Sequence, residues 1–421
     1  MSTAGNAPGV TLEDALFSGP APDGGLYVPE TLPRLAAPRP GAPLTVTALT
    51  VARELLRDDV PPSALESIVD ESLDFDIPLV PVEPGVFSLE LFHGPTLAFK
   101  DVGARFMARL MCYFLERRRR EVTVLVATSG DTGSAVAHAF HGLPDIRVVV
   151  LFPRGKVSPL QQKLMTTLEG NVSALAVEGT FDDCQAMVKG AFADSALVSR
   201  RPLSSANSIN LGRLLPQTFY YFHLASQLPP EAQDPLVVST PSGNFGNLTA
   251  GLVAKRMGLR VQRFVAATNV NDVVPEYLKS GVFRPRPSVE TLSNAMDVGN
   301  PSNWVRILWL YRGSLADLRI DVRGSAHTDE ETVSAIKDVY QRTGYLLDPH
   351  SAVGYLGALE SDGGTAVVLS TAHPAKFKET VDEAIQTPIG LPPALQEAAR
   401  RRERFLTIEA DYRALKEYLE A

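Results

Sequence analysis

Short runs of β-branched residues alternate with longer helical segments over most of this chain, from about residue 90 onward. Such alternation is typical of parallel strands joined by crossover helices, because a parallel pair needs a long connection. The candidate strands are 122–127 (VTVLVA), 146–152 (IRVVVLF), 172–177 (VSALAV), 236–240 (LVVST), 261–267 (VQRFVAA) and 366–371 (AVVLST). The pattern predicts an α/β fold with open, mostly parallel sheets, and it favours two sheets.

The residues before this alternating region have a different character. Residues 1–86 are expected to form an N-terminal segment with a short helix that begins after Thr11 and ends at Gly19. A loop rich in Pro and Gly follows, and a helical pair is expected near 47–73. The stretch IPLVPVEPG, residues 77–85, is interpreted as the hinge into the main body.

At 421 residues the chain exceeds what a single core usually supports. The α/β part is therefore expected to form two domains, 87–230 and 231–421. A helix over 102–119 has apolar residues on one face, which indicates that it packs against a core.

The charge balance and the scattered His and Cys residues exclude several classes of function. The chain has 48 acidic and 40 basic residues, a net charge of -8, so no nucleic-acid partner is expected. Cys112 and Cys184 lie far apart, and no His or Cys spacing matches a metal site. No apolar stretch is long enough to cross a membrane and no signal peptide is recognisable, so a cytoplasmic location is expected.

Two glycine-rich turns each follow a candidate strand and precede a helix. The first is TSGDTG, which contains Thr128, Ser129 and Thr132, and the second runs from Gly243 through Asn244, Phe245 and Gly246 to Asn247. Glycines there allow backbone N–H groups to converge on an anion at a helix N-terminus. Neither turn matches the nucleotide-binding motifs GxxxxGK[ST] or GxGxxG. Two such turns suggest two anionic ligands, or two anionic groups brought together.

Lys100 directly follows the apolar residues Leu97, Ala98 and Phe99, an unusual place for a surface lysine. One interpretation is that it caps, or extends over, the next helix. The other is that it is a reactive amine, although removing the proton from an ordinary lysine at pH 7 costs about 4.6 kcal/mol. A covalent link to an aldehyde cofactor avoids this cost, and pyridoxal phosphate fits because its phosphate needs an N–H cradle. The pattern alone leaves both interpretations open.

Several longer motifs carry a resemblance to a known family. They are APDGGLYVPE, LELFHGPTLAFKD, ATSGDTG, PRGKVSPLQQKL, NSINLGRLLPQ, PSGNFGNLTAG, AATNVNDVVP, LSNAMDVGNPSN and TAHPAKF. Together, and in this order along nearly the whole chain, they resemble the threonine synthase family. These are pyridoxal-phosphate lyases of threonine biosynthesis with the tryptophan-synthase-β-like fold (fold type II), so the resemblance implies the same fold and cofactor here.

The resemblance also implies roles for residues that would hold the cofactor. Lys100 corresponds to the Schiff-base lysine, which would also move protons once the substrate has released it. The backbone from Gly243 to Asn247 (Gly243, Asn244, Phe245, Gly246 and Asn247) corresponds to the loop that binds the cofactor phosphate. Thr371 corresponds to the Ser or Thr opposite the pyridine nitrogen, where a neutral hydroxyl leaves that nitrogen largely unprotonated.

Other positions match substrate-binding residues of the family. Thr128, Ser129 and Thr132 correspond to the cradle for the substrate carboxylate. Asn207 and Arg213 correspond to the site of the substrate phosphate, for which the planar guanidinium of an arginine is well suited.

Five polar residues near the motifs have less defined roles. Many relatives with this fold carry Asn at the position of Asp131, and an ionised Asp cannot donate a hydrogen bond as that amide does. Asp131 could then be protonated, turned away or bonded to backbone. Arg154 and Lys156 are further candidates for the phosphate, although ordinary surface polarity also explains them. His93 and His373 flank motifs and are interpreted as structural, hydrogen-bonded residues.

The resemblance implies conversion of O-phospho-L-homoserine and water to L-threonine and phosphate. Two alternatives are a pyridoxal-phosphate-dependent serine/threonine dehydratase and a non-catalytic protein that binds phosphate ligands. The oligomeric state is left open between monomer and homodimer, since the N-terminal segment could pack on its own domain or on a neighbour's.

Overall fold

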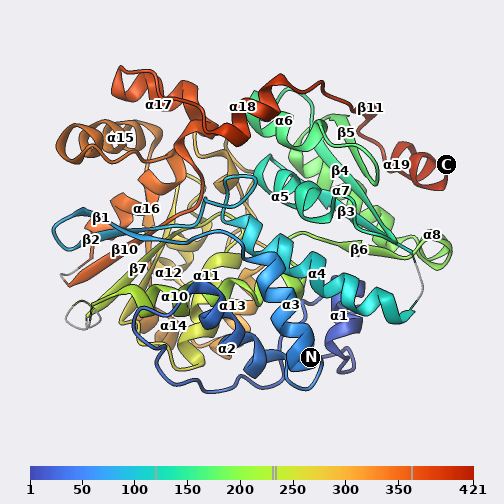
Figure 1. Cartoon of the computed structure of the whole chain (residues 1–421), viewed down its shortest axis with the longest axis horizontal. Helices are drawn as coiled ribbons and strands as arrows, with labels where there is room; N and C mark the ends of the chain where they lie inside the picture. Colours follow the sequence, from blue (N-terminus) through green and yellow to red (C-terminus); the bar gives the residue numbers. More distant parts are fainter. Residues whose placement is uncertain (119–120, 230–231, 233–234, 362–363) are drawn as a thin grey trace.

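The structure is a computed structural model that describes residues 1–118, 121–229, 232, 235–361 and 364–421 (Figure 1). Within these residues the strands are β1 Leu79–Glu83, β2 Val86–Glu90, β3 Val122–Ala127, β4 Ile146–Pro153, β5 Val172–Glu178, β6 Leu203–Ser205, β7 Leu236–Pro241, β8 Arg263–Thr268, β9 Val322–Ala326, β10 Thr365–Ser370 and β11 Leu406–Glu409. They form one sheet in the order β1-β2-β10-β7-β8-β9 and another in the order β11-β5-β4-β3-β6. The β1/β2 pair is antiparallel and the other pairs are parallel. The predicted class, with two open and mostly parallel sheets, is confirmed.

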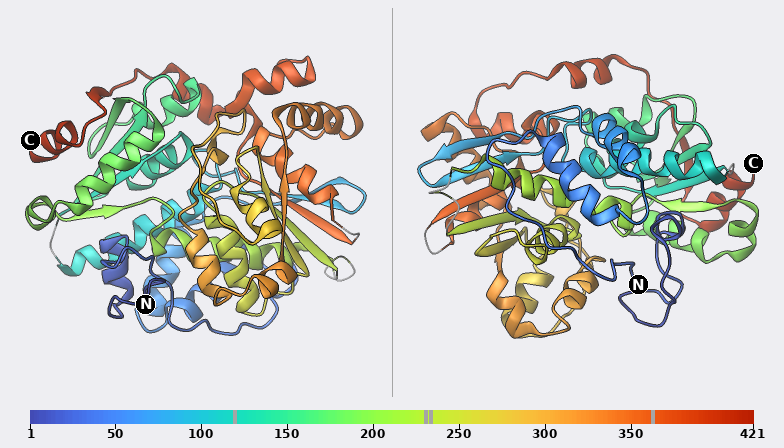
Figure 2. Two further views of the ribbon diagram at one scale, coloured as in Figure 1. Left: turned by 180° about the vertical axis from the view of Figure 1, so that it is seen from behind. Right: turned by 60° about the horizontal axis from the view of Figure 1, so that its bottom comes forward.

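Helices surround both sheets, as the three views show (Figures 1 and 2). The α-helices of the described residues are α1 Leu12–Ser18, α2 Leu44–Leu56, α3 Pro62–Ser72, α4 Lys100–Arg118, α5 Asp131–Phe140, α6 Pro159–Thr166, α7 Phe181–Ala193, α8 Ser195–Arg200, α9 Leu211–Leu214, α10 Gln217–Gln227, α11 Gly246–Arg256, α12 Val273–Ser280, α13 Trp304–Leu310, α14 Leu315–Asp321, α15 Asp329–Thr343, α16 Pro349–Leu359, α17 Lys378–Ile385, α18 Pro393–Arg400 and α19 Tyr412–Glu420. Two 3-10 turns are η2 Asn294–Met296 and η3 Pro374–Phe377. The helix predicted over 102–119 is α4, although residue 119 lies outside the described part of the chain.

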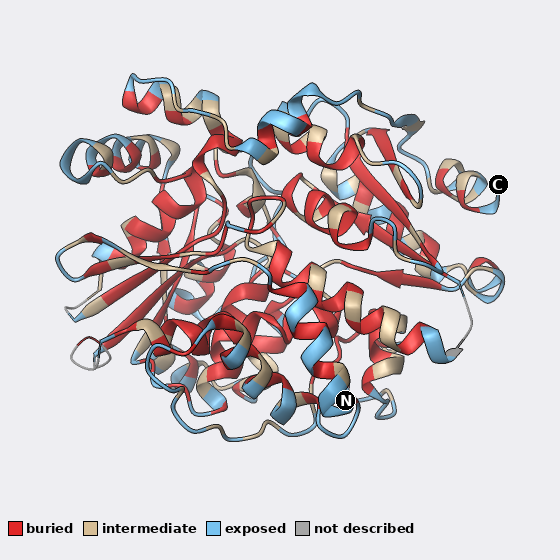
Figure 3. Ribbon diagram, in the orientation of Figure 1, coloured by how far each residue is buried: buried red, intermediate tan, exposed pale blue. Residues whose placement is uncertain are grey.

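The central strands are buried on both faces, which is why their sequences are continuous apolar runs. Every residue of β3 and of β7 is buried, and Figure 3 shows the central strands of both sheets in red, the colour of buried residues. All six predicted strands are present, with ends that differ by at most two residues. Continuous β-branched runs flanked by turns therefore located the strands correctly.

The prediction of a hinge at 77–85 is wrong. Most of this stretch is β1 and the turn into β2, and β1 lies at the edge of the larger sheet. A proline such as Pro81 removes a backbone donor, but an edge strand tolerates that loss because its outer side pairs with no other strand. The short strands β6, β9 and β11 were also not predicted, since each has five residues or fewer.

The two sheets are not continuous in sequence. The β2 strand lies beside β10 in the larger sheet, although the predicted boundary at 86/87 falls at its first residue. The β11 strand lies beside β5 in the smaller sheet, although it comes from the predicted domain 231–421. The boundaries at 86 and 230 stay predictions, and the sheets do not follow them.

The N-terminal segment packs on its own chain. Helix α1 begins after Thr11, whose hydroxyl accepts a hydrogen bond from the Asp14 amide, and ends at Gly19 with φ 73°, as predicted. Helix α2 packs on α10 and α3 packs on α4, and these two helices are the pair expected near 47–73. The Leu16 carbonyl accepts hydrogen bonds from the side chains of Ser204 (2.9 Å) and Asn210 (2.8 Å).

The C-terminal segment connects the two sheets. Helix α17 packs on α15 beside the larger sheet, α18 then packs on α6, and β11 pairs with β5 in the smaller sheet. In the right-hand view of Figure 2 this segment, in orange and red, crosses the top of the molecule.

Arg306 ties three segments of the chain together from a fully buried position in α13. Its guanidinium donates hydrogen bonds to the carbonyl oxygens of Tyr27 (2.9 and 3.1 Å), Ser208 (3.1 Å) and Ile209 (2.7 Å). It also donates to Asn303 Oδ1 at 2.7 Å. No carboxylate of the described residues forms an ion pair with it, and burial lowers its pKa to about 9.

We expect Arg306→Met to lower the thermal unfolding midpoint by several degrees, because each buried acceptor left unpaired costs about 1–3 kcal/mol. Differential scanning fluorimetry measures the midpoint. Arg260→Met, which removes an exposed arginine, is the matched control and should leave the midpoint nearly unchanged. Equal midpoints for the two variants would contradict the clamping role of Arg306.

Candidate active site

A cavity of about 1050 Å³ lies where strands from both sheets end. Its walls include the residues that follow the carboxyl ends of β3, β6, β7 and β10. In open α/β sheets this end is where ligands bind, because the loops there converge while the strands hold them in place.

Every site residue predicted from the sequence lines this cavity. These residues are Lys100, Thr128, Ser129, Thr132, Asn207, Arg213, Gly243, Asn244, Phe245, Gly246, Asn247 and Thr371. The fold thus brings together segments from five separate parts of the chain. Their individual roles stay predictions.

Lys100 is the first residue of α4, and the segment before it is fixed against the end of β10. The Phe99 amide donates to the Thr371 carbonyl at 2.9 Å, and Ala98 forms a bridge with Ala372. Leu97 has φ 56°, a left-handed conformation that is unfavourable for leucine. Such strain is concentrated at functional sites, where the surrounding structure enforces it.

The amine of Lys100 is half-buried in the cavity, and its pKa is lowered to about 8. Burial is the main cause; the positive charges of Lys376 and Arg213 act in the same direction, and the charge of Asp131 opposes them. With a pKa of about 8, roughly one amine in ten is neutral at pH 7, compared with roughly one in three thousand for an ordinary lysine. The site therefore makes a nucleophilic amine available near neutral pH.

The turn after β7 has the form of an anion cradle. A Cβ on Gly243 would come within 2.6 Å of the Ala295 carbonyl oxygen, so only glycine fits there. Phe245 adopts φ 58°, and α11 begins at the next residue, Gly246. The Asn244 amide donates to Ser208 Oγ at 2.8 Å, which fixes the loop. Backbone N–H groups at the start of α11 are free to bind an anion.

Two buried donors near the cavity have no partner among the described residues. Asn247 Oδ1 accepts hydrogen bonds from the hydroxyls of Tyr220 and Tyr221, both at 2.7 Å, which leaves Asn247 Nδ2 unpaired. Nε of Arg213 is also buried and unpaired. Buried donors are nearly always satisfied in native proteins, so these two donors on the cavity wall are candidates to bind a ligand.

Arg213 supplies a buried positive charge on the cavity wall. It lies in the short helix α9 and donates to the Ala206 carbonyl. Burial lowers its pKa to about 10 and the charge of Asp101 opposes this, so the guanidinium stays charged at neutral pH. Nearby, the Asn207 amide donates to the Ala127 carbonyl at 2.8 Å and is held in place by it.

The TSGDTG turn after β3 is stabilised by its own first residue. Thr128 Oγ1 accepts hydrogen bonds from the amides of Gly130 (2.9 Å) and Gly133 (2.8 Å), which shapes the start of α5. Ser129 and Thr132 are half-buried on the cavity wall.

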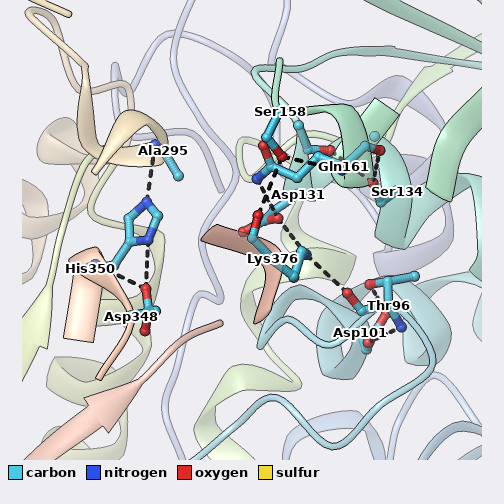
Figure 4. A network of polar contacts seen from close by, with 12 residues as sticks. Thr96, Asp101, Asp131, Ser134, Ser158, Gln161, Ala295, Asp348, His350 and Lys376 are labelled. Atoms are coloured by element: carbon cyan, nitrogen blue, oxygen red, sulfur yellow. Dashed lines mark hydrogen bonds and ion pairs between the residues drawn. The ribbon is translucent and has the colours of Figure 1, made fainter. Parts of the chain in front are cut away.

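Asp131, in the same turn, is ionised and paired with the buried Lys376. The two side chains lie 2.5 Å apart, and Gln161 Nε2 donates to the same carboxylate oxygen at 2.8 Å (Figure 4). Burial alone would raise the pKa of Asp131, but the charges of Lys376 and Lys100 hold it well below its usual range. None of the three arrangements expected for Asp131 is found: it is not protonated, it faces the cavity, and it binds side chains rather than backbone.

Four further candidates lie outside the cavity wall. Arg154 is exposed and pairs with Glu178, and Lys156 is exposed. His93 lies 2.7 Å from Glu90, and His373 accepts a hydrogen bond from the Ala375 amide at 3.0 Å. Neither histidine lines the cavity, which agrees with the structural roles expected for them.

Sequence analysis missed a histidine on the cavity wall. His350 Nδ1 donates to Asp348 Oδ1 at 2.8 Å, and His350 Nε2 accepts from the Ala295 amide at 3.2 Å (Figure 4). The contact holds the loop 294–302, which forms part of the wall. That loop also carries Asp297, whose pKa burial raises to about 6. The Asn-rich stretch LSNAMDVGNPSN was a visible signal for this loop, whereas nothing in the sequence marked His350.

Two general features of the described residues bear on the type of site. No group of three or more His, Cys, Asp and Glu side chains in them is arranged to hold a metal ion. Their helices include none with the length and apolar character that crossing a lipid bilayer requires.

These residues fit pyridoxal phosphate. The amine of Lys100 is suited to its aldehyde, and the cradle at Gly243 to Asn247, with the unpaired Asn247 amide, is suited to its phosphate. Thr371, at the end of β10, offers a neutral hydroxyl on the same cavity wall. None of these contacts with the cofactor uses the buried Arg213. Its positive charge is therefore available as a second anion site.

Comparisons with known proteins agree with this fit. The profile of the family described as pyridoxal-phosphate dependent enzyme matches residues 78–371. Profiles described as threonine synthase N terminus and threonine synthase, C-terminal, match residues 1–73 and 351–419.

Individual relatives match over nearly the whole chain. The threonine synthase of Haemophilus influenzae is 48% identical over 92% of this chain and 91% of its own length, and that of Escherichia coli is 45% identical over 97% and 96%. A crystal structure of the Brucella melitensis threonine synthase with PLP bound matches with a TM-score of 0.93 at 39% identity, covering 100% of this chain and 98% of that one. The predicted fold type and cofactor are thereby confirmed, and the chain belongs to the threonine synthase family of pyridoxal-phosphate dependent enzymes.

Proposed function

We propose that this chain converts O-phospho-L-homoserine and water to L-threonine and phosphate. One observation carries the proposal: a single cavity holds a lysine amine, an anion cradle and a separate buried arginine. A substrate with its own phosphate needs a second anion site beyond the one that holds the cofactor. Arg213 supplies that second site.

The cofactor would be held at three places. Lys100 would bind its aldehyde, the backbone from Gly243 to Asn247 would bind its phosphate, and the hydroxyl of Thr371 would face the ring nitrogen. When bound, pyridoxal phosphate supplies a carbonyl for the substrate amine and an electron sink for the charge left at the α-carbon.

The protein's own residues position the substrate and move its protons. Thr128, Ser129 and Thr132 bind its α-carboxylate, in a turn that Thr128 also stabilises. Lys100, released when the substrate binds, takes the α-proton as a general base. Loss of a β-proton then lets phosphate leave from the γ-carbon, and Arg213 stabilises the charge that develops on it. Water adds at the β-carbon, and protons return to the γ- and α-carbons to give threonine.

The two alternatives are less well supported. A serine/threonine dehydratase acts on substrates without a phosphate and would have no use for the charge of Arg213. A non-catalytic binding protein would not need a lysine whose pKa is lowered to about 8.

The test is an absorption spectrum of the holoenzyme before and after addition of O-phospho-L-homoserine, with released phosphate and threonine measured together. We expect a spectral change and equal amounts of the two products. Release of ammonia from serine or threonine, without phosphate release from O-phospho-L-homoserine, would favour the dehydratase. A protein that binds no cofactor on reconstitution would favour the binding protein.

The other predictions from the sequence extend this proposal. The cytoplasmic location, the choice between monomer and homodimer, and the domain division at 86 and 230 stay predictions.

A further inference from the structure

A buried ion pair lies directly behind the cavity wall. The side chain of Lys376 is 0% exposed and that of Asp131 is 3% exposed. Lys376 Nζ donates to the Thr96 carbonyl at 2.9 Å and lies 2.5 Å from Asp131 Oδ1. Asp131 lines the cavity, whereas Lys376 and Gln161 do not. Lys376 can therefore act on the contents of the cavity through its charge and through Asp131, without lining the cavity itself.

Both donors act on one oxygen of the carboxylate. Gln161 Nε2 and Lys376 Nζ both approach Asp131 Oδ1 (Figure 4). Gln161 is itself fully buried, and its backbone amide donates to Ser158 Oγ. Two side chains that do not line the cavity therefore hold the carboxylate of Asp131 in place.

Stability alone does not explain this pair. Two charges taken out of water lose hydration energy that their attraction barely repays, and well-packed apolar residues are often as stable or more stable in such places. Strongly perturbed charged groups that line a cavity are concentrated at functional sites. The reactive amine of Lys100 lies in the same cavity.

The charges around Lys100 act in opposite directions. Asp131, in α5, favours the protonated amine, whereas Lys376, in η3, and Arg213, in α9, favour the neutral amine. Burial raises the pKa of Asp131 itself, whereas the positive charges of Lys376 and Lys100 lower it, and His350 has the smallest effect in that direction. Because Lys376 and Asp131 carry equal and opposite charges, their effects on Lys100 partly cancel.

We propose that Lys376 is a positioning residue for the reaction: it holds Asp131 ionised and fixed, and the two together balance the charge that the Lys100 amine experiences. The inference rests on the proposed function only in that Lys100 is taken to move protons. A general base works best when its neutral and protonated forms are both accessible near the working pH. Asp131 and Lys376 together keep both forms of the Lys100 amine accessible near the working pH. Loss of either residue alone would shift the protonation equilibrium of that amine.

The test measures Lys100 directly in protein freed of cofactor, without substrate. Competitive labelling with acetic anhydride across a pH series, followed by peptide mass spectrometry, gives the pH at which Lys100 reactivity is half maximal. The exposed Lys337 in the same digest corrects for the reagent. The variants are Asp131→Asn, Lys376→Met and the double variant.

We expect opposite shifts from the two single variants. Asp131→Asn should lower the midpoint and Lys376→Met should raise it, each by on the order of one pH unit. The double variant should return close to the parent, because both charges are gone. In the holoenzyme, the limb of the pH profile of kcat that reports Lys100 should move in the same directions.

Lys378→Met is the matched control. It removes a neighbouring ion pair of similar length, Lys378 with Asp382 at 2.5 Å, that does not line the cavity. It should leave the midpoint unchanged even if it lowers stability. Shifts of the same sign in both single variants, or a double variant displaced further than either, would overturn the proposal.

If Lys376→Met folds poorly, a second variant still tests the proposal. Lys376→Gln keeps a hydrogen-bond donor without the charge and should also raise the midpoint. An unchanged midpoint in both Lys376→Gln and Asp131→Asn would overturn the balancing role. Because no turnover is measured in the labelling experiment, its result does not depend on whether O-phospho-L-homoserine is the substrate.

Discussion

Lys100→Ala should abolish the reaction, with kcat falling by at least about 10⁴-fold. The variant loses the amine that would hold the cofactor and the base that would take the α-proton. The cradle from Gly243 to Asn247 remains, so weak binding of the cofactor through its phosphate should persist. We therefore expect protein that lacks the absorption of a lysine-bound cofactor and releases no phosphate.

The measurement is a visible spectrum after reconstitution, together with a phosphate-release assay. Borohydride treatment should leave the cofactor covalently attached to the parent protein and not to the variant. Lys337→Ala, which removes an exposed lysine of α15, should match the parent in all three experiments. Normal turnover by Lys100→Ala would falsify the assignment of this amine.

Arg213→Gln should separate binding of the cofactor from binding of the substrate. The variant keeps a polar side chain but loses the positive charge proposed to face the leaving phosphate. We expect kcat/KM for O-phospho-L-homoserine to fall by about 10²- to 10³-fold, the usual loss when a charge-stabilising donor is removed from a transition state. The spectrum of the bound cofactor should be unchanged.

Steady-state kinetics and a cofactor titration measure the two effects. Arg213→Lys should recover only part of the activity, because an ammonium keeps the charge without the planar fork of the guanidinium. Arg154→Gln alters an exposed arginine outside the cavity and serves as the control. A loss in Arg154→Gln with no loss in Arg213→Gln would move the phosphate site to the surface.

Local sequence patterns predicted those parts of the fold whose physical cause is local. The strand at 122–127 is buried on both faces and is therefore apolar throughout, which makes it visible in the sequence. The turns containing Gly130 and Gly243 were likewise visible, because close approach of neighbouring groups excludes any side chain there. Several of the predicted site residues line one cavity because their motifs follow the ends of strands: Thr128 follows β3, Gly243 follows β7 and Thr371 follows β10.

The features that were not predicted depend on distant partners. Nothing near 86–90 indicates that this strand pairs with β10 rather than with the strands that follow it directly. The state of Asp131 is decided by Lys376, which lies in a different part of the chain and is drawn beside it only by the fold. His350 became a wall residue through its contact with Ala295, again a tertiary effect.

The pairing of β11 with β5 has a consequence for biogenesis. A polypeptide leaves the ribosome from its N-terminus, so residues 172–178 emerge long before residues 406–409. Throughout that interval the outer edge of β5 offers unpaired backbone groups, the kind of surface that recruits other strands. The edge of β5 is therefore the part of the smaller sheet most open to pairing with other chains until residues 406–409 have been synthesised.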